Sequence, residues 1–243
     1  MKNLLLLLVI GLFVNNATAQ DSTSVKLYDF PFFMYAGPQS IKASELNDML
    51  TANGFTKLPN NALLFGTTST IHRSRFGFGV SLEYLATGAN QSGGNRVTSL
   101  KGITSGVHVS YYIIQKTDFT LYPILALRVA RLEVRSIDKE PVANVNDALA
   151  TAHRNATIRY VNDMIDLGIG MSARTMTTRR RFNCPQAERY LSFDARIGYN
   201  IAVGSRAEYN FASLSNAPEL RFGGPYFRLG IGFGSSWRSL NWK

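Results

Sequence analysis

Apolar and polar side chains alternate along the segment 226–237, near the end of the chain. Large apolar residues such as Phe227, Leu229 and Ile231 occupy the odd positions, whereas the even positions are mostly glycine with one arginine, Arg228. Successive side chains of a strand point to opposite faces, so the pattern predicts a strand with one apolar face and one face of small residues. This combination suits a membrane barrel, which has a lipid-facing exterior and a narrow polar interior.

Seven more segments carry the same alternation. They predict strands at residues 28–36, 62–72, 76–87, 102–114, 119–134, 160–174 and 190–204. Short links at 72–75 and 115–118 alternate with long links at 37–61, 88–101, 135–159 and 205–224. An even strand number and alternating link lengths are typical of outer-membrane barrels. The expected fold class is all-β, an antiparallel transmembrane β-barrel of eight strands, with ten strands as the alternative.

The first long link is expected to contain a short helix at residues 44–53. Ser44 is a suitable N-cap, and the dipeptide Asn53-Gly54 is a natural stop. An apolar stripe runs along the helix, formed by Leu46, Met49 and Leu50. The helix either caps the barrel mouth or presents this stripe to a partner protein.

One link departs from the alternation, because residues 176–189 are long for a turn on the short-link side. The link contains a run of cations, Arg179, Arg180 and Arg181, followed by Phe182 and the single cysteine, Cys184. The run is either a solvated basic face or a docking site, in which the arginines pair with acidic groups of a partner and Phe182 is an apolar anchor. One cysteine excludes an internal disulfide and leaves a free thiol or an intermolecular bond.

Residues 1–19 have the three parts of a secretory signal peptide. Lys2 supplies the positive start, residues 4–14 the apolar stretch, and Ala17-Thr18-Ala19 the cleavage site. We therefore expect residues 20–243 to form one exported barrel domain. The formal net charge is +10, which fits either a generally solvated basic surface or binding to outer-membrane lipid, lipopolysaccharide or an acidic partner protein. Export makes nucleic acid a poor candidate.

The inward face of the predicted barrel holds seven charged residues. Charges in a medium of low dielectric constant must be paired, and eight strands enclose only enough space for side chains. The pattern therefore predicts a salt-bridged core, with a narrow pore as the alternative. Inward glycines, including 168, 170, 198, 230, 232 and 234, are expected to make room for the arginines. The seven charged residues are Glu83, Arg128, Asp166, Arg174, Asp194, Arg196 and Arg228.

His108 and Ser110 lie two residues apart on one predicted strand and therefore share a face. With Glu83 from the preceding strand they would supply a base, a nucleophile and a carboxylate for acyl transfer. The set resembles the His-x-Ser and Glu arrangement of lipid A deacylase barrels. Here, however, the alternation turns His108 and Ser110 inward, where a lipid acyl chain does not reach. Three separated histidines and one cysteine offer no metal-ligand spacing, and we expect no cofactor.

The alternation, the loop asymmetry and the aromatic-rich last strand resemble those of the small eight-stranded Gram-negative outer-membrane barrels, which include the OmpA transmembrane domain and OmpX. The end of the signal peptide and the helix at 44–55 are similar to barrels of the Bacteroidota, in which Asp21-Ser22-Thr23 also resembles an O-glycosylation acceptor. The resemblance implies an architecture and an outer-membrane location.

The leading functional hypothesis is a non-enzymatic barrel that serves as a membrane-embedded subunit or anchor through protein contacts. Its interface would be the periplasm-facing link 176–189 or the link 37–61. The alternatives are a lipid A-modifying acyl hydrolase and a narrow pore or uptake barrel.

Overall fold

A computed structural model describes residues 26–87, 96–116, 118–138, 156–179, 187–209, 212–213 and 217–239. The sequence-predicted signal peptide and Ser22 and Thr23 lie outside this range. The elements, in chain order, are β1 (Lys26–Lys42), α2 (Ser44–Ala52), β2 (Asn61–Arg73), β3 (Phe76–Ala86), β4 (Arg96–Tyr111), β5 (Ile114–Gln115), β6 (Phe119–Asp138), β7 (Ala156–Arg179), β8 (Ala187–Tyr209), β9 (Ala212–Ser213) and β10 (Arg221–Ser239).

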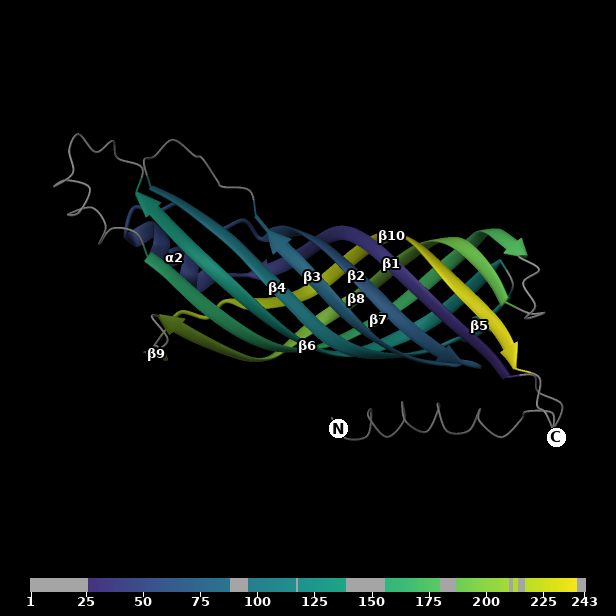
Figure 1. Cartoon of the computed structure of the whole chain (residues 1–243). Coiled ribbons are helices and arrows are strands. Elements are labelled where there is room, and N and C mark those ends of the chain that lie inside the picture. Colours follow the sequence, from purple (N-terminus) through teal and green to yellow (C-terminus); the bar gives the residue numbers. More distant parts are fainter. Residues whose placement is uncertain are drawn as a thin grey trace.

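The sheet closes on itself as an antiparallel barrel of eight long strands (Figure 1). Each strand pairs with its neighbours in the order β1-β2-β3-β4-β6-β7-β8-β10, and β10 pairs back with β1. The two remaining strands, β5 and β9, have two residues each and attach to β6 and β8. The prediction of an eight-stranded antiparallel barrel is confirmed. The ten-strand alternative is wrong, because the two short strands take no part in closure.

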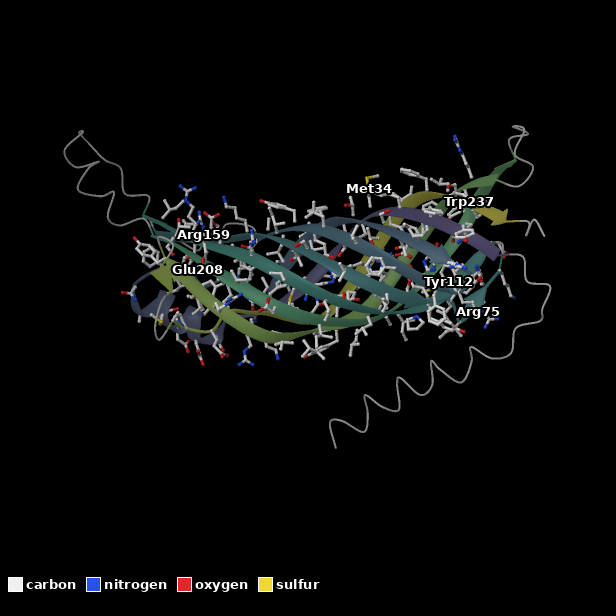
Figure 2. All side chains as sticks on the ribbon, turned by 60° about the horizontal axis from the view of Figure 1, so that its bottom comes forward. Met34, Arg75, Tyr112, Arg159, Glu208 and Trp237 are labelled. Atoms are coloured by element: carbon white, nitrogen blue, oxygen red, sulfur yellow. The ribbon has the colours of Figure 1, made fainter. Side chains whose placement is uncertain are left out.

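The outer surface of the barrel carries a belt of exposed apolar side chains. On β3, Phe76, Phe78 and Leu82 are 54, 58 and 57% exposed. Figure 2 shows Met34 of β1 and Trp237 of β10 pointing away from the wall in the same way. An apolar surface that encircles the molecule is too large to be left in water, and hydrocarbon is the solvent that matches it. The barrel therefore spans a membrane with its strands.

The strands run well past this belt on the side of the long links. Outward residues of β6 are apolar up to Val129 and then become Arg131, Glu133 and Arg135. A transmembrane strand needs only about 9–11 residues, whereas β7 has 24 and β8 has 23. The predicted strands were too short at these ends. The outward residues stop being apolar where the wall enters water, but the backbone hydrogen bonds between the strands continue.

The two ends of the barrel differ, as the link lengths predict (Figure 1). One end holds the tight β2–β3 turn, β5, the start of β1 and the end of β10; we call it the turn end. The other end holds α2, and there successive strands are joined by the long links; we call it the loop end. Of the described residues, only α2 forms a helix, and it is too short to cross a bilayer.

α2 is held in the barrel mouth by its buried face. Leu46 and Leu50 pack into an apolar cluster that we call the plug, which has members from all eight long strands, among them Leu64, Leu132 and Phe222. The side chain of Asn47 donates to the carbonyl of Leu58 at 3.1 Å and accepts from its N–H at 2.7 Å.

Two details of the helix prediction change, and a third is confirmed. The N-cap position is Ala43, which offers no side-chain hydrogen bond, and Ser44 is the first helical residue. Gly54, with φ of 75°, provides the predicted stop. Met49 is 50% exposed, because it lies at the edge of the buried face that Leu46, Asn47 and Leu50 form. The two leucines are therefore unavailable to a partner protein, and the helix acts as a cap of the mouth.

Candidate functional site

The lumen of the membrane-spanning part is filled by charged and hydroxyl-bearing side chains in three layers. All seven predicted inward charges point into it, and an eighth, Asp29 of β1, was missed. With Asp29 the described lumen holds four carboxylates and four guanidinium groups, so its formal charges cancel. The arrangement confirms the predicted salt-bridged core.

The layer at the turn end is organised around Asp29, which is fully buried. Its carboxylate accepts a hydrogen bond from Tyr112 at 3.1 Å, another from Tyr190, and an ion pair from Arg174 of β7. His72 stacks on Tyr112 with ring centroids 3.9 Å apart. These partners come from around the whole wall, so the layer ties opposite strands together.

The middle layer joins Asp194 and Arg196, which are two residues apart on β8 and therefore share the inward face. Arg196 Nε lies 2.6 Å from Asp194 Oδ1, and the hydroxyl of Tyr122 donates to the same carboxylate. The guanidinium of Arg196 also lies within 6 Å of the rings of Phe33 and Tyr35. Ring faces carry negative charge and add to the stabilisation of a desolvated cation.

The layer nearest the loop end is a four-member network. Glu83 of β3 pairs with Arg128 of β6 and, at 3.1 Å, with Arg228 of β10. Asp166 of β7 completes it at 2.8 Å from Arg128, and the hydroxyl of Tyr35 donates to Glu83. Above this layer, Asn200 donates to Gln39 across the lumen at 2.8 Å, and the plug follows. The described lumen is thus crossed by paired charges inside the membrane and by apolar side chains beyond it.

The inward glycines take a different role from the predicted one, because they face aromatic rings. A Cβ on Gly170 would lie 2.6 Å from the Tyr122 ring, and one on Gly168 or Gly198 would lie within 2.5 Å of the Tyr226 hydroxyl. Gly232 and Gly234 follow the same rule, beside the rings of Phe33 and Tyr190, whereas Gly230 lies against the backbone of Met34 and Tyr35. The correction has a simple reason: a flat ring on one strand leans over the neighbouring strand and needs a position without a side chain. The arginines reach into the lumen instead.

The acyl-transfer set is not assembled. His108 and Ser110 are both buried in the lumen, as the alternation predicts. The register places Glu83 opposite Thr104 and His108 opposite Gly79. The backbone position of Glu83 is therefore four residues along β3 from Gly79, the partner of His108, or about 13 Å.

The hydrogen bonds of these residues also do not join them to one another. His108 Nε2 lies 3.0 Å from the hydroxyl of Thr70, while Glu83 is held by the two arginines. Ser110 Oγ makes no hydrogen bond to any described residue. The hypothesis that these three residues form one catalytic site is wrong, because the strand register separates them.

The link 176–189 is shorter than predicted. β7 continues to Arg179 and β8 begins at Ala187, where Arg179 is opposite Glu188. The connection is therefore 180–186. This segment, which contains Arg180, Arg181, Phe182 and Cys184, lies outside the described residues. What remains is a β7–β8 hairpin that extends past its neighbour.

The free edge of this hairpin follows from the pairing of β6. The last rung between β6 and β7 joins Phe119 to Ala173, and the N–H of Arg174 donates to the carbonyl of Asp118 at 2.8 Å. Beyond this point β7 is paired only with β8. Among the described residues, no strand covers the other edge of β7 from Thr175 to Arg179, a length of about 17 Å.

Comparisons with known proteins return barrels of the same general kind. No protein-family model matches the chain, and no curated protein matches its sequence. Ail, the attachment invasion locus protein of Yersinia pestis, is 10% identical with a TM-score of 0.41, covering 88% of this chain and 99% of Ail. Outer membrane protease OmpT from Escherichia coli is 8% identical with a TM-score of 0.35, covering 92% and 99%. Outer membrane protein OprG from Pseudomonas aeruginosa is 11% identical with a TM-score of 0.37, covering 89% and 98%. Similarity this low assigns no function to the chain.

Proposed function

We propose that the protein is an outer-membrane β-barrel of a Gram-negative bacterium that acts without catalysis, as a membrane-embedded subunit or anchor that binds other proteins. The apolar belt and the contrast between turn end and loop end support the location, since bacterial barrels place short turns in the periplasm. A cleaved signal peptide at residues 1–19 would bring it there.

The filled lumen supports a role at the surface of the barrel rather than inside it. A pore would need a continuous path past Arg128, Arg196 and Arg228, and each of these is paired with a carboxylate in the lumen. A lipid acyl hydrolase would need His108 at the lipid face, whereas His108 is buried inside. Protein contacts through the ends of the barrel are the function that the geometry supports best.

The free edge of β7 is the observation that carries the proposal. An uncovered strand edge presents backbone N–H and C=O groups that pair readily with an extended segment of another chain. The edge ends at Arg179, and Arg180 and Arg181 follow it in sequence. An acidic extended segment of a periplasmic or membrane partner is the complementary occupant, because arginine forms paired hydrogen bonds with carboxylates.

Charge reversal combined with crosslinking tests this interface. The variant Arg179→Glu/Arg180→Glu/Arg181→Glu is extracted from native membranes in mild detergent, and the mass of the particle that carries it is measured. The wild-type chain should run in a defined complex larger than the 26.9 kDa chain alone, and the variant should run as a single barrel. A photo-crosslinking residue at Thr178 should capture the same companion.

Two exposed arginines beside the tight β2–β3 turn provide the matched control. Arg73→Glu/Arg75→Glu changes charge at the same end of the barrel but away from the β7 edge. It should leave the complex intact, and a crosslinker at Arg75 should capture nothing. A lone wild-type particle, or a complex that survives the triple reversal and gives no crosslink at Thr178, would refute the proposal.

A further inference from the structure

The lipid-facing wall contains a groove of about 720 Å³ that no part of the proposed interface uses. It crosses β3, β4, β6, β7 and β8 on the loop-end side of the belt. Its lining is mostly apolar and includes Val107, Leu127, Val129, Ile165 and Val203, together with Ser105 and one carboxylate, Asp163.

Short side chains create the hollow. Ser105, Val107 and Val129 stand at outward positions. Leu82, which is opposite Ser105, and Ile103, two residues before Ser105 on β4, are larger. The groove is therefore built into the sequence of the wall, and it opens directly onto the hydrocarbon of the membrane.

Two arginines stand at its upper rim, where the belt ends. Arg131 follows Val129 by two residues on β6 and so shares its outward face. Arg131 is opposite Val161 of β7, which in turn is opposite Arg206 of β8. The two arginines therefore occupy one rung with a single valine between them, about 10 Å apart at the backbone.

The rim has a surplus of positive charge. The side chain of Arg206 is 71% exposed and lies 3.9 Å from Asp163, a long contact between exposed groups. No carboxylate of the described residues lies within ion-pair distance of Arg131. The neighbouring acid, Glu133, is 3.6 Å from Lys101. Exposed pairs of this kind are weak, so the rim arginines are free to bind an external anion.

We propose that the groove and its rim bind one phosphorylated membrane lipid, with an acyl chain in the groove and the phosphate between Arg131 and Arg206. The apolar groove and the basic rim lie at the membrane depths of a lipid's acyl chain and phosphate. Hydrocarbon lies against the apolar lining, and the charged head group lies at the edge of the belt. Guanidinium groups bind phosphate through paired, charge-assisted hydrogen bonds. A transmembrane segment of a protein would fill the groove but leave the two arginines without an anion.

Native mass spectrometry of the full-length barrel in detergent tests the site. The probes are dioleoyl-phosphatidylglycerol, bisphosphorylated lipid A and, as a zwitterionic control, dioleoyl-phosphatidylcholine. Wild-type protein should retain one anionic lipid and release phosphatidylcholine. Arg131→Gln/Arg206→Gln should weaken retention about tenfold or more, because each cation at a membrane surface contributes about 1 kcal/mol toward an anionic lipid.

A second pair of variants tests the groove independently of charge. Ser105→Phe fills the hollow and should also weaken retention. Ser235→Phe places the same ring at an outward position of β10, opposite Phe30 and Arg189, which do not line the groove, and should not. Arg73→Gln/Arg75→Gln, at the turn end, is the matched charge control.

The outcomes separate the sources of the ligand and the alternatives. Retention of lipid A alone assigns the site to lipopolysaccharide, and retention of both anionic lipids assigns it to phosphorylated lipids in general. Equal retention of phosphatidylcholine, or no effect of either the arginine or the Ser105 variant, would overturn the proposal. Co-purification of a protein that Ser105→Phe displaces would overturn it in favour of a protein partner. The result is independent of the β7 edge, which lies at the opposite end.

Discussion

Inward glycines and inward rings form complementary pairs across neighbouring strands of this lumen. The ring of Tyr122 on β6 lies against Gly170 on β7, and its hydroxyl then reaches Asp194 on β8. The absence of a side chain at this glycine therefore allows a tyrosine to pass over one strand and bind a carboxylate on the next.

Gly170→Ala should destabilise the barrel by about 1–3 kcal/mol, the usual cost of an extra methyl group in a filled interior. The added Cβ would lie 2.6 Å from two ring atoms of Tyr122, which is fixed by Asp194 and by an edge contact with Tyr112. Urea unfolding in lipid vesicles, followed by tryptophan fluorescence, measures the change.

Gly204→Ala is the control for this prediction. Its Cβ would meet only the Asp163 carboxylate, at 3.7 Å, and should cost little. Equal stabilities of the two variants would show that the ring of Tyr122 moves aside without loss, and would contradict the pairing of glycine and ring.

The alternation of side chains was enough to place residues on the correct face but not to pair them. It turned Glu83, Arg128 and Asp166 inward, and they are inward. The same alternation turns Asp29 inward, and the prediction overlooked it. Its partners Tyr112, Arg174 and Tyr190 are 83, 145 and 161 residues away. Local periodicity contains no information about which inward groups meet across a lumen, since that depends on register and tilt.

At the scale of elements, α2 converts an open barrel mouth into a closed one. Leu46 is 3% exposed and belongs to the plug, whereas Met49, at the edge of the buried face, is half exposed. The sequence predicted the helix and its stop, because the stripe and Gly54 are local signals. It did not predict which side chains of the stripe are buried, because Asn47 anchors the helix to Leu58 and so sets its rotation.

Leu46→Ala should therefore cost about 2–5 kcal/mol, the range for removing a buried leucine side chain from a packed core. Met49→Ala, on the exposed face of the same helix, should cost less than about 0.5 kcal/mol. The measurement is urea unfolding of the barrel in vesicles, with limited proteolysis at the loop end as a second readout. Similar losses for both variants would mean that α2 does not pack as described.

At the scale of the whole molecule, one barrel contains two kinds of core. Inside the membrane the wall is apolar outside and charged inside, with carboxylates and guanidinium groups balanced. Beyond the membrane the wall is charged outside, at Arg131, Glu133 and Arg135, and apolar inside. The second part is built like a soluble barrel because water surrounds it, and burying apolar surface stabilises it in the usual way. Figure 2 places Arg159 and Glu208 on this extramembrane part.

These two cores are independent barriers, and we expect the barrel not to conduct. In planar bilayers the wild-type protein should give no stepwise current under conditions where a sixteen-stranded porin, whose lumen holds water, does. Leu46→Ala should also remain silent. Loosening the plug leaves the networks of Asp29, Asp194 and Glu83 in place, and each joins side chains of separate strands within the membrane. Reproducible unitary steps from the wild type would restore the pore alternative. Steps from Leu46→Ala alone would show that the plug, and not the charged layers, closes the lumen.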